Sequence, residues 1–169
     1  TPRHYGLESG CGQSIYDLSD SDMELNVGAV VRWIHSTMMM QADGWGGDIG
    51  LQSRFYSGPF LYDFGASFQN MGVGQAFVDV RDSLPFRARV GGAIYPARGL
   101  SLSMEVVTPI NMYPFAAVGA EYSRQFDKNL TAAVRAGFNS RTLGSLGPLS
   151  AMSIGGGVKL SDLSFDYAF

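Results

Sequence analysis

The chain has 169 residues, a formal net charge of −3 and 46% hydrophobic residues. This length is enough for one domain with its own core, and the charge does not favour nucleic-acid binding. No run of eighteen apolar residues occurs, which excludes a transmembrane helix. Cys11 is the single cysteine, which excludes an internal disulfide framework and leaves either an incidental small residue or a free thiol.

Residues 1–22 show no sustained hydrophobic period and include the acidic stretch DLSDSD at 17–22. We therefore predict a loop or irregular N-terminal segment at 1–22 and one β domain at 23–169. The 22 glycines and the 12% aromatic residues are typical of a β protein with many turns and close backbone contacts.

From residue 23 onward, apolar side chains recur at every second position. Val27 and Val31 share one side of the first such segment, and Asn26 and Arg32 share the other. This period of two predicts β-strands. The pattern predicts nine strands, at residues 23–39, 45–56, 60–70, 84–95, 100–107, 115–126, 130–139, 150–160 and 163–169.

The expected connections alternate in length along the chain. Short turns are expected at 57–59, 96–99, 127–129 and 161–162, a turn at Asp43-Gly44, and longer connections at 70–83, 108–114 and 139–149. Short turns on one edge of a sheet and longer loops on the other are typical of outer-membrane barrels. Most expected strands have nine to twelve residues, and a tilted strand that crosses a bilayer needs roughly 9–11.

Twelve charged residues fall on the non-apolar side of their strands. An Arg or Lys that faces lipid at the bilayer midplane costs about 2–4 kcal/mol, so charges in a membrane barrel are driven inward. Six acids and six bases indicate a paired interior network rather than an ion-selective pore. The predicted interior charge network consists of Glu24, Arg32, Asp48, Arg54, Asp63, Arg87, Arg89, Glu105, Glu121, Arg135, Lys159 and Asp166.

The polar side of the strands is built mainly from Gly, Ser, Ala and Asn, and only Lys128 and Lys159 among the twelve basic residues are lysines. Soluble barrels usually carry Lys and Glu on their wet surface, although any amphipathic strand segregates its charges. We therefore predict an all-β, antiparallel up-and-down transmembrane β-barrel, with a soluble barrel as the alternative.

Four longer motifs carry a family resemblance: YDFGASFQNMG (62–72), LPFRARVGGAIYP (84–96), VGAEYSRQFDKNLTAAVRAGFNS (118–140) and SIGGGVKLSDLSFDYAF (153–169). They resemble the PorV/PorQ family of outer-membrane proteins, which are FadL-like barrels, over roughly residues 23–169. The resemblance implies a bacterial outer-membrane barrel of about fourteen strands with a plugged or gated lumen. It implies no catalytic residue.

The chain matches only the later part of such a barrel. Nine strands that end on the long-loop side do not close, because complete barrels normally have an even strand number. We therefore expect residues 115–169 to form one wall of a larger barrel, interrupted at Phe169.

No catalytic or metal-binding pattern stands out. His4 and His35 have no Cys or carboxylate at metal-ligand spacing, so we interpret His35 as an interfacial residue. The glycines at 155–157 are not followed by a phosphate-binding sequence, and close strand packing explains them better. Met38, Met39 and Met40 favour an apolar patch over a soft metal site. We expect no enzyme activity and no cofactor.

Aromatic residues near the strand ends predict the girdles of a membrane barrel, with core aromatics of a soluble fold as the alternative. They are Trp33, Trp45, Tyr56, Tyr62, Tyr95 and Tyr113. The connection at 69–85 is the best candidate for a loop that enters the lumen or binds a partner, although an ordered surface loop is equally compatible. Its candidate residues are Gln69, Asn70, Met71, Phe77, Val78 and Arg81.

Two main functions follow from the resemblance. One is an accessory or shuttle partner of a secretion apparatus, related to type IX secretion, which binds proteins through its outer loops. The other is FadL-like passive transport of hydrophobic small molecules, and a structural role in the envelope is a third. All three imply outer-membrane lipid as a partner, and a lumen filled by paired charges favours the secretion role.

Overall fold

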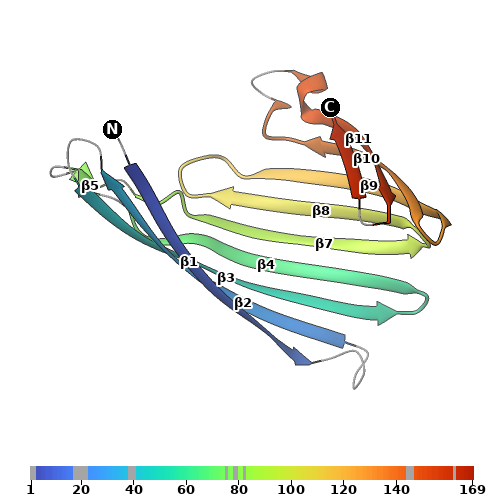
Figure 1. Ribbon diagram of the computed structural model, residues 1–169, viewed down its shortest axis with the longest axis horizontal. Helices are drawn as coiled ribbons and strands as arrows, with labels where there is room; N and C mark the ends of the chain where they lie inside the picture. Colours follow the sequence, from blue (N-terminus) through green and yellow to red (C-terminus); the bar gives the residue numbers. More distant parts are fainter. Residues whose placement is uncertain are drawn as a thin grey trace. The chain divides into compact units, whose positions relative to one another are not determined.

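The computed structural model describes residues 3–16, 23–37, 41–74, 76–77, 80–81, 83–143, 147–161 and 163–169 (Figure 1). Ten strands form one antiparallel up-and-down sheet, in which each strand pairs with its neighbours in the chain. They are β1 (Arg3–Tyr16), β2 (Met23–Thr37), β3 (Gln41–Ser57), β4 (Phe60–Val73), β7 (Arg87–Ala97), β8 (Leu100–Pro109), β9 (Phe115–Asp127), β10 (Leu130–Asn139), β11 (Met152–Leu160) and β12 (Leu163–Ala168).

Two smaller elements accompany the sheet. The short strands β5 (Ala76–Phe77) and β6 (Val80–Arg81) pair with each other, and the 3₁₀ helix η1 (Pro148–Ala151) precedes β11. Within the described ranges, no helix has the length and apolarity required to span a bilayer.

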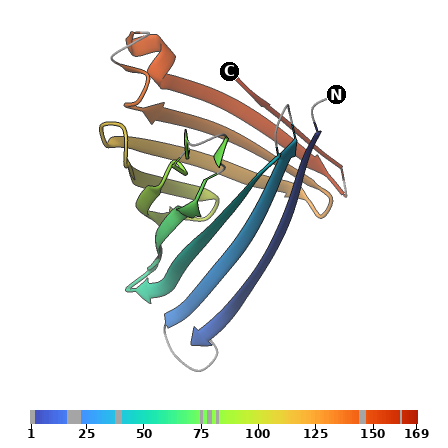
Figure 2. The same ribbon diagram turned by 90° about the vertical axis from the view of Figure 1, so that its left-hand side faces the viewer.

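The chain divides into two compact units. The first contains Thr1–Ser53, Gly65–Val90 and Val107–Tyr113, and the second contains Arg54–Phe64, Gly91–Val106 and Pro114–Phe169. Figure 2 shows β1, β2 and β3 side by side in the first unit. In the second unit, β9, β10, β11 and β12 pair in sequence order.

The prediction of an irregular segment at 1–22 is wrong over most of its length. Residues 3–16 form β1, which pairs with β2 from Arg3↔Thr37 to Tyr16↔Leu25. The odd positions of β1 include Ser9, Cys11 and Gln13, so the apolar alternation that predicts a strand is interrupted there. The partner strand supplies the hydrogen bonds that the local pattern does not reveal, and the sheet has ten strands rather than nine.

Strand boundaries elsewhere agree with the prediction to within a few residues, with one internal error. The predicted turn at Asp43-Gly44 lies inside β3, which begins at Gln41. An Asp-Gly pair favours a turn locally, but here Asp43 is held by side chains of β2. From β3 onward the predicted alternation is confirmed, because two-residue connections at 58–59, 98–99, 128–129 and 161–162 alternate with longer ones.

Very few apolar side chains are buried. Among the described residues, the buried hydrophobic residues are Ala42, Val107 and Ala151. The apolar side of each strand is exposed instead, as shown by Met104 at 58%, Val134 at 62% and Ile154 at 66% exposure. The strands therefore do not form their sheet around a hydrophobic core of their own.

Two turn glycines adopt positive φ angles, which L-residues with a side chain rarely adopt. Gly58 has φ 60° in the β3–β4 turn, and Gly99 has φ 79° in the β7–β8 turn. A Cβ atom at Gly58 would meet open space, whereas one at Gly99 would collide with the carbonyl oxygen of Ser123. Gly99 accepts a 2.7 Å hydrogen bond from the Ser123 amide, so β9 approaches this turn closely.

These two turns provide a matched test of the β7–β8–β9 contact. Gly58→Ala should lower the free energy of unfolding by about 1 kcal/mol, because only the backbone conformation is strained. Gly99→Ala should cost more, since the new methyl group must also displace Ser123. Denaturant titration of the refolded protein in detergent measures both. Equal losses in the two variants would contradict the close approach of β9 to the turn.

Candidate functional site

Polar side chains of the first unit meet in a cluster around Arg32, which we term the Arg32 cluster (Glu8, Arg32, Asp48 and Asn70). Arg32 Nε donates to Glu8 Oε2 at 2.7 Å, and Arg32 Nη2 donates to Asp48 Oδ2 at 3.3 Å. The Asn70 amide donates to Asp48 Oδ1 at 2.7 Å. Glu8 lies directly opposite Arg32 in the β1–β2 register, so one guanidinium connects β1, β2 and β3.

Glu8 is a member of the Arg32 cluster that the sequence pattern does not predict. Its segment was predicted to be irregular, and a charged residue in a loop has no face to which it can be assigned. The sequence carries one signal for this side of β1, because Gly6, Glu8, Gly10 and Gly12 share the side opposite Leu7.

The second unit contains the Arg54 cluster (Arg54, Asp63 and Tyr95), which connects β3, β4 and β7. Arg54 Nε and Nη2 donate to the two oxygens of Asp63 at 2.7 and 2.9 Å, a bidentate pair. The Tyr95 hydroxyl donates to Asp63 Oδ2 at 3.0 Å. The Asp63 side chain is only 14% exposed. Its carboxylate is less exposed than those of Glu8, Asp48, Asp43, Glu121 and Asp166, which also take part in ion pairs.

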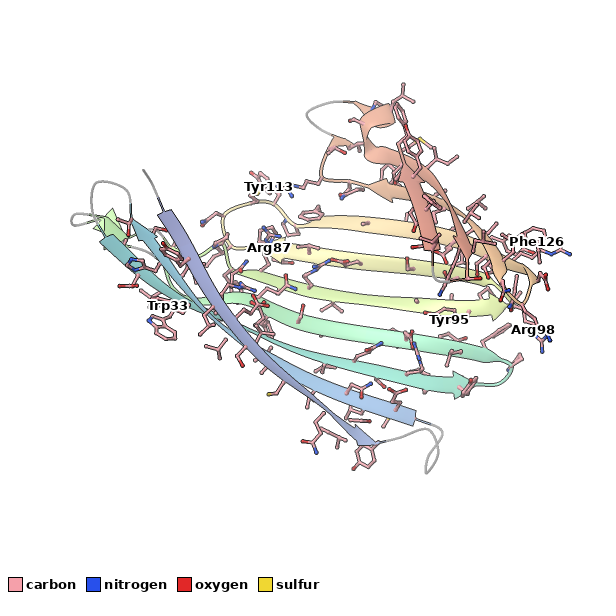
Figure 3. The ribbon with its side chains drawn as sticks, in the orientation of Figure 1. Trp33, Arg87, Tyr95, Arg98, Tyr113 and Phe126 are labelled. Carbon is pink, nitrogen blue, oxygen red and sulfur yellow. The ribbon has the colours of Figure 1, made fainter. Side chains whose placement is uncertain are left out.

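Tyr95 lies near the end of β7 (Figure 3), and its contact with Asp63 contradicts the prediction that it belongs to an aromatic girdle. The prediction used its position near a strand end. The period of two places Tyr95 on the opposite side of β7 from Ile94, and this is the side on which Asp63 lies.

The Arg135 cluster (Glu121, Arg135 and Asp166) occupies β9, β10 and β12. Arg135 Nε donates to Glu121 Oε2 at 2.6 Å, and Arg135 Nη1 donates to Asp166 Oδ1 at 2.5 Å. Glu121 lies directly opposite Arg135, but Asp166 belongs to the strand beyond β11. A Cβ atom on Gly157 of β11 would collide with the Asp166 carboxylate, so the glycine leaves the path between them open. The close packing predicted for the glycines at 155–157 is thus explained at Gly157 by the Asp166 carboxylate, which occupies the space that a side chain would need.

The remaining members of the predicted charge network are Glu24, Arg87, Arg89, Glu105 and Lys159. Glu24 accepts a 2.6 Å hydrogen bond from Asn26 Nδ2, and both Arg89 and Glu105 have interaction partners. Arg87, labelled in Figure 3, and Lys159 have no ion pair with the described residues. Three of the predicted arginines, Arg32, Arg54 and Arg135, therefore connect acids across strands.

The predicted partner loop at 69–85 is largely ordered into strands. Gln69, Asn70 and Met71 belong to β4, where Asn70 adopts a φ of 57°. The backbones of Phe77 and Arg81 belong to β5 and β6. Val78 lies outside the described residues, as do Met38, Met39 and Met40. A hydrogen bond from the Asn70 amide to Asp48 extends β4 beyond the end expected from its apolar alternation.

An open apolar groove of about 520 Å³ lies in the first unit, over β1, β2, β3 and β4. The residues that line it are Gly12, Gln13, Val27, Gly28, Ala29, Ile49, Gly50, Leu51, Ala66, Phe68 and the exposed Cys11. No charged side chain lines the groove, and its volume is within the range of small-molecule sites.

Among the described residues, no group of three or more His, Cys, Asp or Glu side chains is arranged to hold a metal ion. Comparisons with protein-family models, with curated proteins and with solved structures found no match. The resemblance to the PorV/PorQ family therefore stays a prediction that rests on the motifs in the sequence.

The Arg54 cluster permits a graded test of stability. Asp63→Asn replaces the charged carboxylate that accepts two hydrogen bonds from the Arg54 guanidinium, and it should lower the free energy of unfolding by about 1–3 kcal/mol. Tyr95→Phe removes one neutral donor and should cost about 0.5–1.5 kcal/mol. Urea unfolding of both variants measures the difference, with Tyr113→Phe as a control at an exposed tyrosine (93%). If Asp63→Asn lowers the free energy of unfolding no more than the control does, the Arg54 cluster does not stabilise the sheet.

Proposed function

We propose that this chain forms part of a transmembrane β-barrel wall in a bacterial outer membrane, with the apolar side of its strands in contact with lipid. The observation that carries the proposal is the inverted burial: large apolar side chains are exposed along the strands, while buried apolar residues are almost absent from the described part. A soluble sheet covers its apolar side with another layer. Exposed apolar surface of this extent indicates an apolar environment.

The opposite side of the strands supports the same proposal. Arg32 and Arg135 each bridge two acids on that side and Arg54 pairs with Asp63, which satisfies charges that could not face lipid. The up-and-down strand order satisfies backbone donors and acceptors between neighbours, which a bilayer requires of every spanning sheet.

Within this class, we propose the role of an accessory or shuttle partner in a protein secretion apparatus. Polar clusters on the non-apolar side of the strands favour a filled interior over an apolar tunnel. Exposed residues in the longer connections offer surfaces for protein partners, for example Tyr113 after β8 at 93% and Leu149 in η1 at 85% exposure. The resemblance to PorV/PorQ supports the secretion context.

FadL-like passive transport is the second candidate. Its support is the apolar groove over β1, β2, β3 and β4, because a hydrophobic small molecule fits the size and the uncharged lining of this site and would reach it from the lipid side of the strands. The groove lies on the apolar side of β2, where Val27 and Ala29 reside, rather than on the side of the Arg32 cluster.

Two single arginine substitutions at neighbouring positions of β8 test whether the apolar side of this strand contacts lipid. Met104 and Ser103 are both exposed and point to opposite sides of the strand. Met104→Arg should lower the free energy of unfolding in lipid bilayers by about 2–4 kcal/mol, because a midplane arginine faces hydrocarbon. Ser103→Arg should cost less than about 1 kcal/mol. Folding titrations in phosphatidylcholine vesicles measure both, and a near-zero cost for Met104→Arg would contradict the proposal.

Photo-crosslinking in native membranes tests the secretion role. A photoreactive amino acid at Tyr113 or Leu149 should capture a protein component of the secretion apparatus, identified by mass spectrometry. The same photoreactive amino acid in place of Asn129, which lies in the two-residue β9–β10 turn, serves as the control. Capture of lipid without protein at Tyr113 and Leu149 would contradict the shuttle role and favour the transport alternative.

A further inference from the structure

A polar cluster interrupts the apolar side of β2 and β3 in the first unit. Asp43 Oδ1 lies 2.9 Å from His35 Nδ1, and His35 Nε2 lies 3.1 Å from Thr37 Oγ1. With the ring proton on Nδ1, His35 donates to Asp43, and its Nε2 accepts from the Thr37 hydroxyl. The three side chains thus form a continuous carboxylate–imidazole–hydroxyl chain.

Surrounding aromatic rings fix the orientation of this imidazole. The His35 ring stacks against Tyr5 at 6.5 Å and 27°, and against Trp33 at 5.8 Å and 28°. Trp33 Nε1 donates a 3.2 Å hydrogen bond to Asp43 Oδ1, which holds the carboxylate in place. The His35 side chain is 21% exposed, so the oriented ring remains partly accessible.

The antiparallel pairing of β2 and β3 creates this arrangement. His35 and Thr37 are two residues apart in β2 and therefore share one side of the strand. Asp43 comes from β3, eight residues after His35 in the chain. A hydroxyl within reach of an imidazole that a third group orients is the geometric signature of an activated nucleophile.

We propose that Thr37, His35 and Asp43 form a site for acyl transfer that hydrolyses carboxylic esters. The Thr37 Oγ1 attacks the ester carbonyl carbon, and His35 Nε2 accepts the hydroxyl proton. The C–O bond of the leaving alcohol breaks, and His35 returns that proton to the alcohol. Water then attacks the acyl-Thr37 ester with the same base, which releases a carboxylic acid and regenerates the hydroxyl. Thr37 and His35 are the catalytic residues, and Asp43 is a positioning residue.

The surroundings of the site define the substrate class. Tyr5 and Trp45 flank the cluster at 54% and 59% exposure, and the Trp33 and Trp45 rings lie tilted against each other with their centroids 6.4 Å apart. Exposed aromatic surface suits an ester with an apolar acyl chain. A bilayer phospholipid is the specific substrate if the chain spans a membrane, because amphipathic rings of this kind lie at the membrane–water interface. The assignment of a phospholipid substrate rests on the proposed function, whereas the assignment of ester hydrolysis does not.

Covalent labelling of the full-length protein in detergent tests the nucleophile. An alkyl fluorophosphonate should form an O–P bond to Thr37 and release fluoride, as located by mass spectrometry of peptides. Thr37→Ser should label at least as fast, because serine keeps the hydroxyl and removes the hindering methyl group. Thr37→Val should not label, and Thr131→Val in β10 should label like the unmodified protein. Absence of label at Thr37, or equal labelling of Thr37→Val, would overturn the proposal.

Ester hydrolysis separates the roles of the three residues. With p-nitrophenyl butyrate in detergent, His35→Gln should lower kcat about 10²–10⁴-fold. Asp43→Asn should lower kcat with KM unchanged, because it removes the group that orients the imidazole. A change in KM alone would overturn the positioning role of Asp43. Hydrolysis of the dispersed ester without hydrolysis of phosphatidylcholine vesicles would overturn the lipid substrate while retaining the site.

Discussion

The constraint on which this structure depends is that its strands are held by pairing with each other, not by a core. Ten strands form one up-and-down sheet, yet buried apolar side chains are almost absent from the described residues. Burial of apolar area is normally the dominant favourable term in folding. In the barrel wall that we propose, contact of the exposed apolar sides with lipid takes the place of that burial.

The polar sides of the strands complement this constraint. Arg32 and Arg135 each bridge two acids from other strands, and Arg54 pairs with Asp63 of the neighbouring strand. Asp166 reaches Arg135 across a glycine in β11. Because a shift of one residue would move each charge to the other side of its strand, these clusters also specify register. The ion pairs and the apolar exposure are thus two consequences of one alternation.

Departures from this alternation are the informative positions of the first unit. Ser9, Cys11 and Gln13 occupy the side of β1 that is apolar at Leu7, and the groove lies beside two of them. His35, Thr37 and Asp43 break the apolar side of β2 and β3 and satisfy each other through hydrogen bonds. Polar groups on an apolar surface carry a desolvation cost, which such mutual bonding offsets.

The sequence by itself determined the strands of the large sheet from residue 60 onward to within a few residues, because period two is a local property that each segment carries in its own residues. The strand β10 agrees at both ends, whereas β5 and β6 lie in a segment predicted as a connection. It also assigned Arg32, Arg54 and Arg135 to the polar side. Only the tertiary structure revealed β1, the continuation of β3 through Asp43, the contact of Tyr95 with Asp63, and the approach of His35 to Asp43. Each of these depends on register between strands, and register is a relation between segments that no single segment encodes.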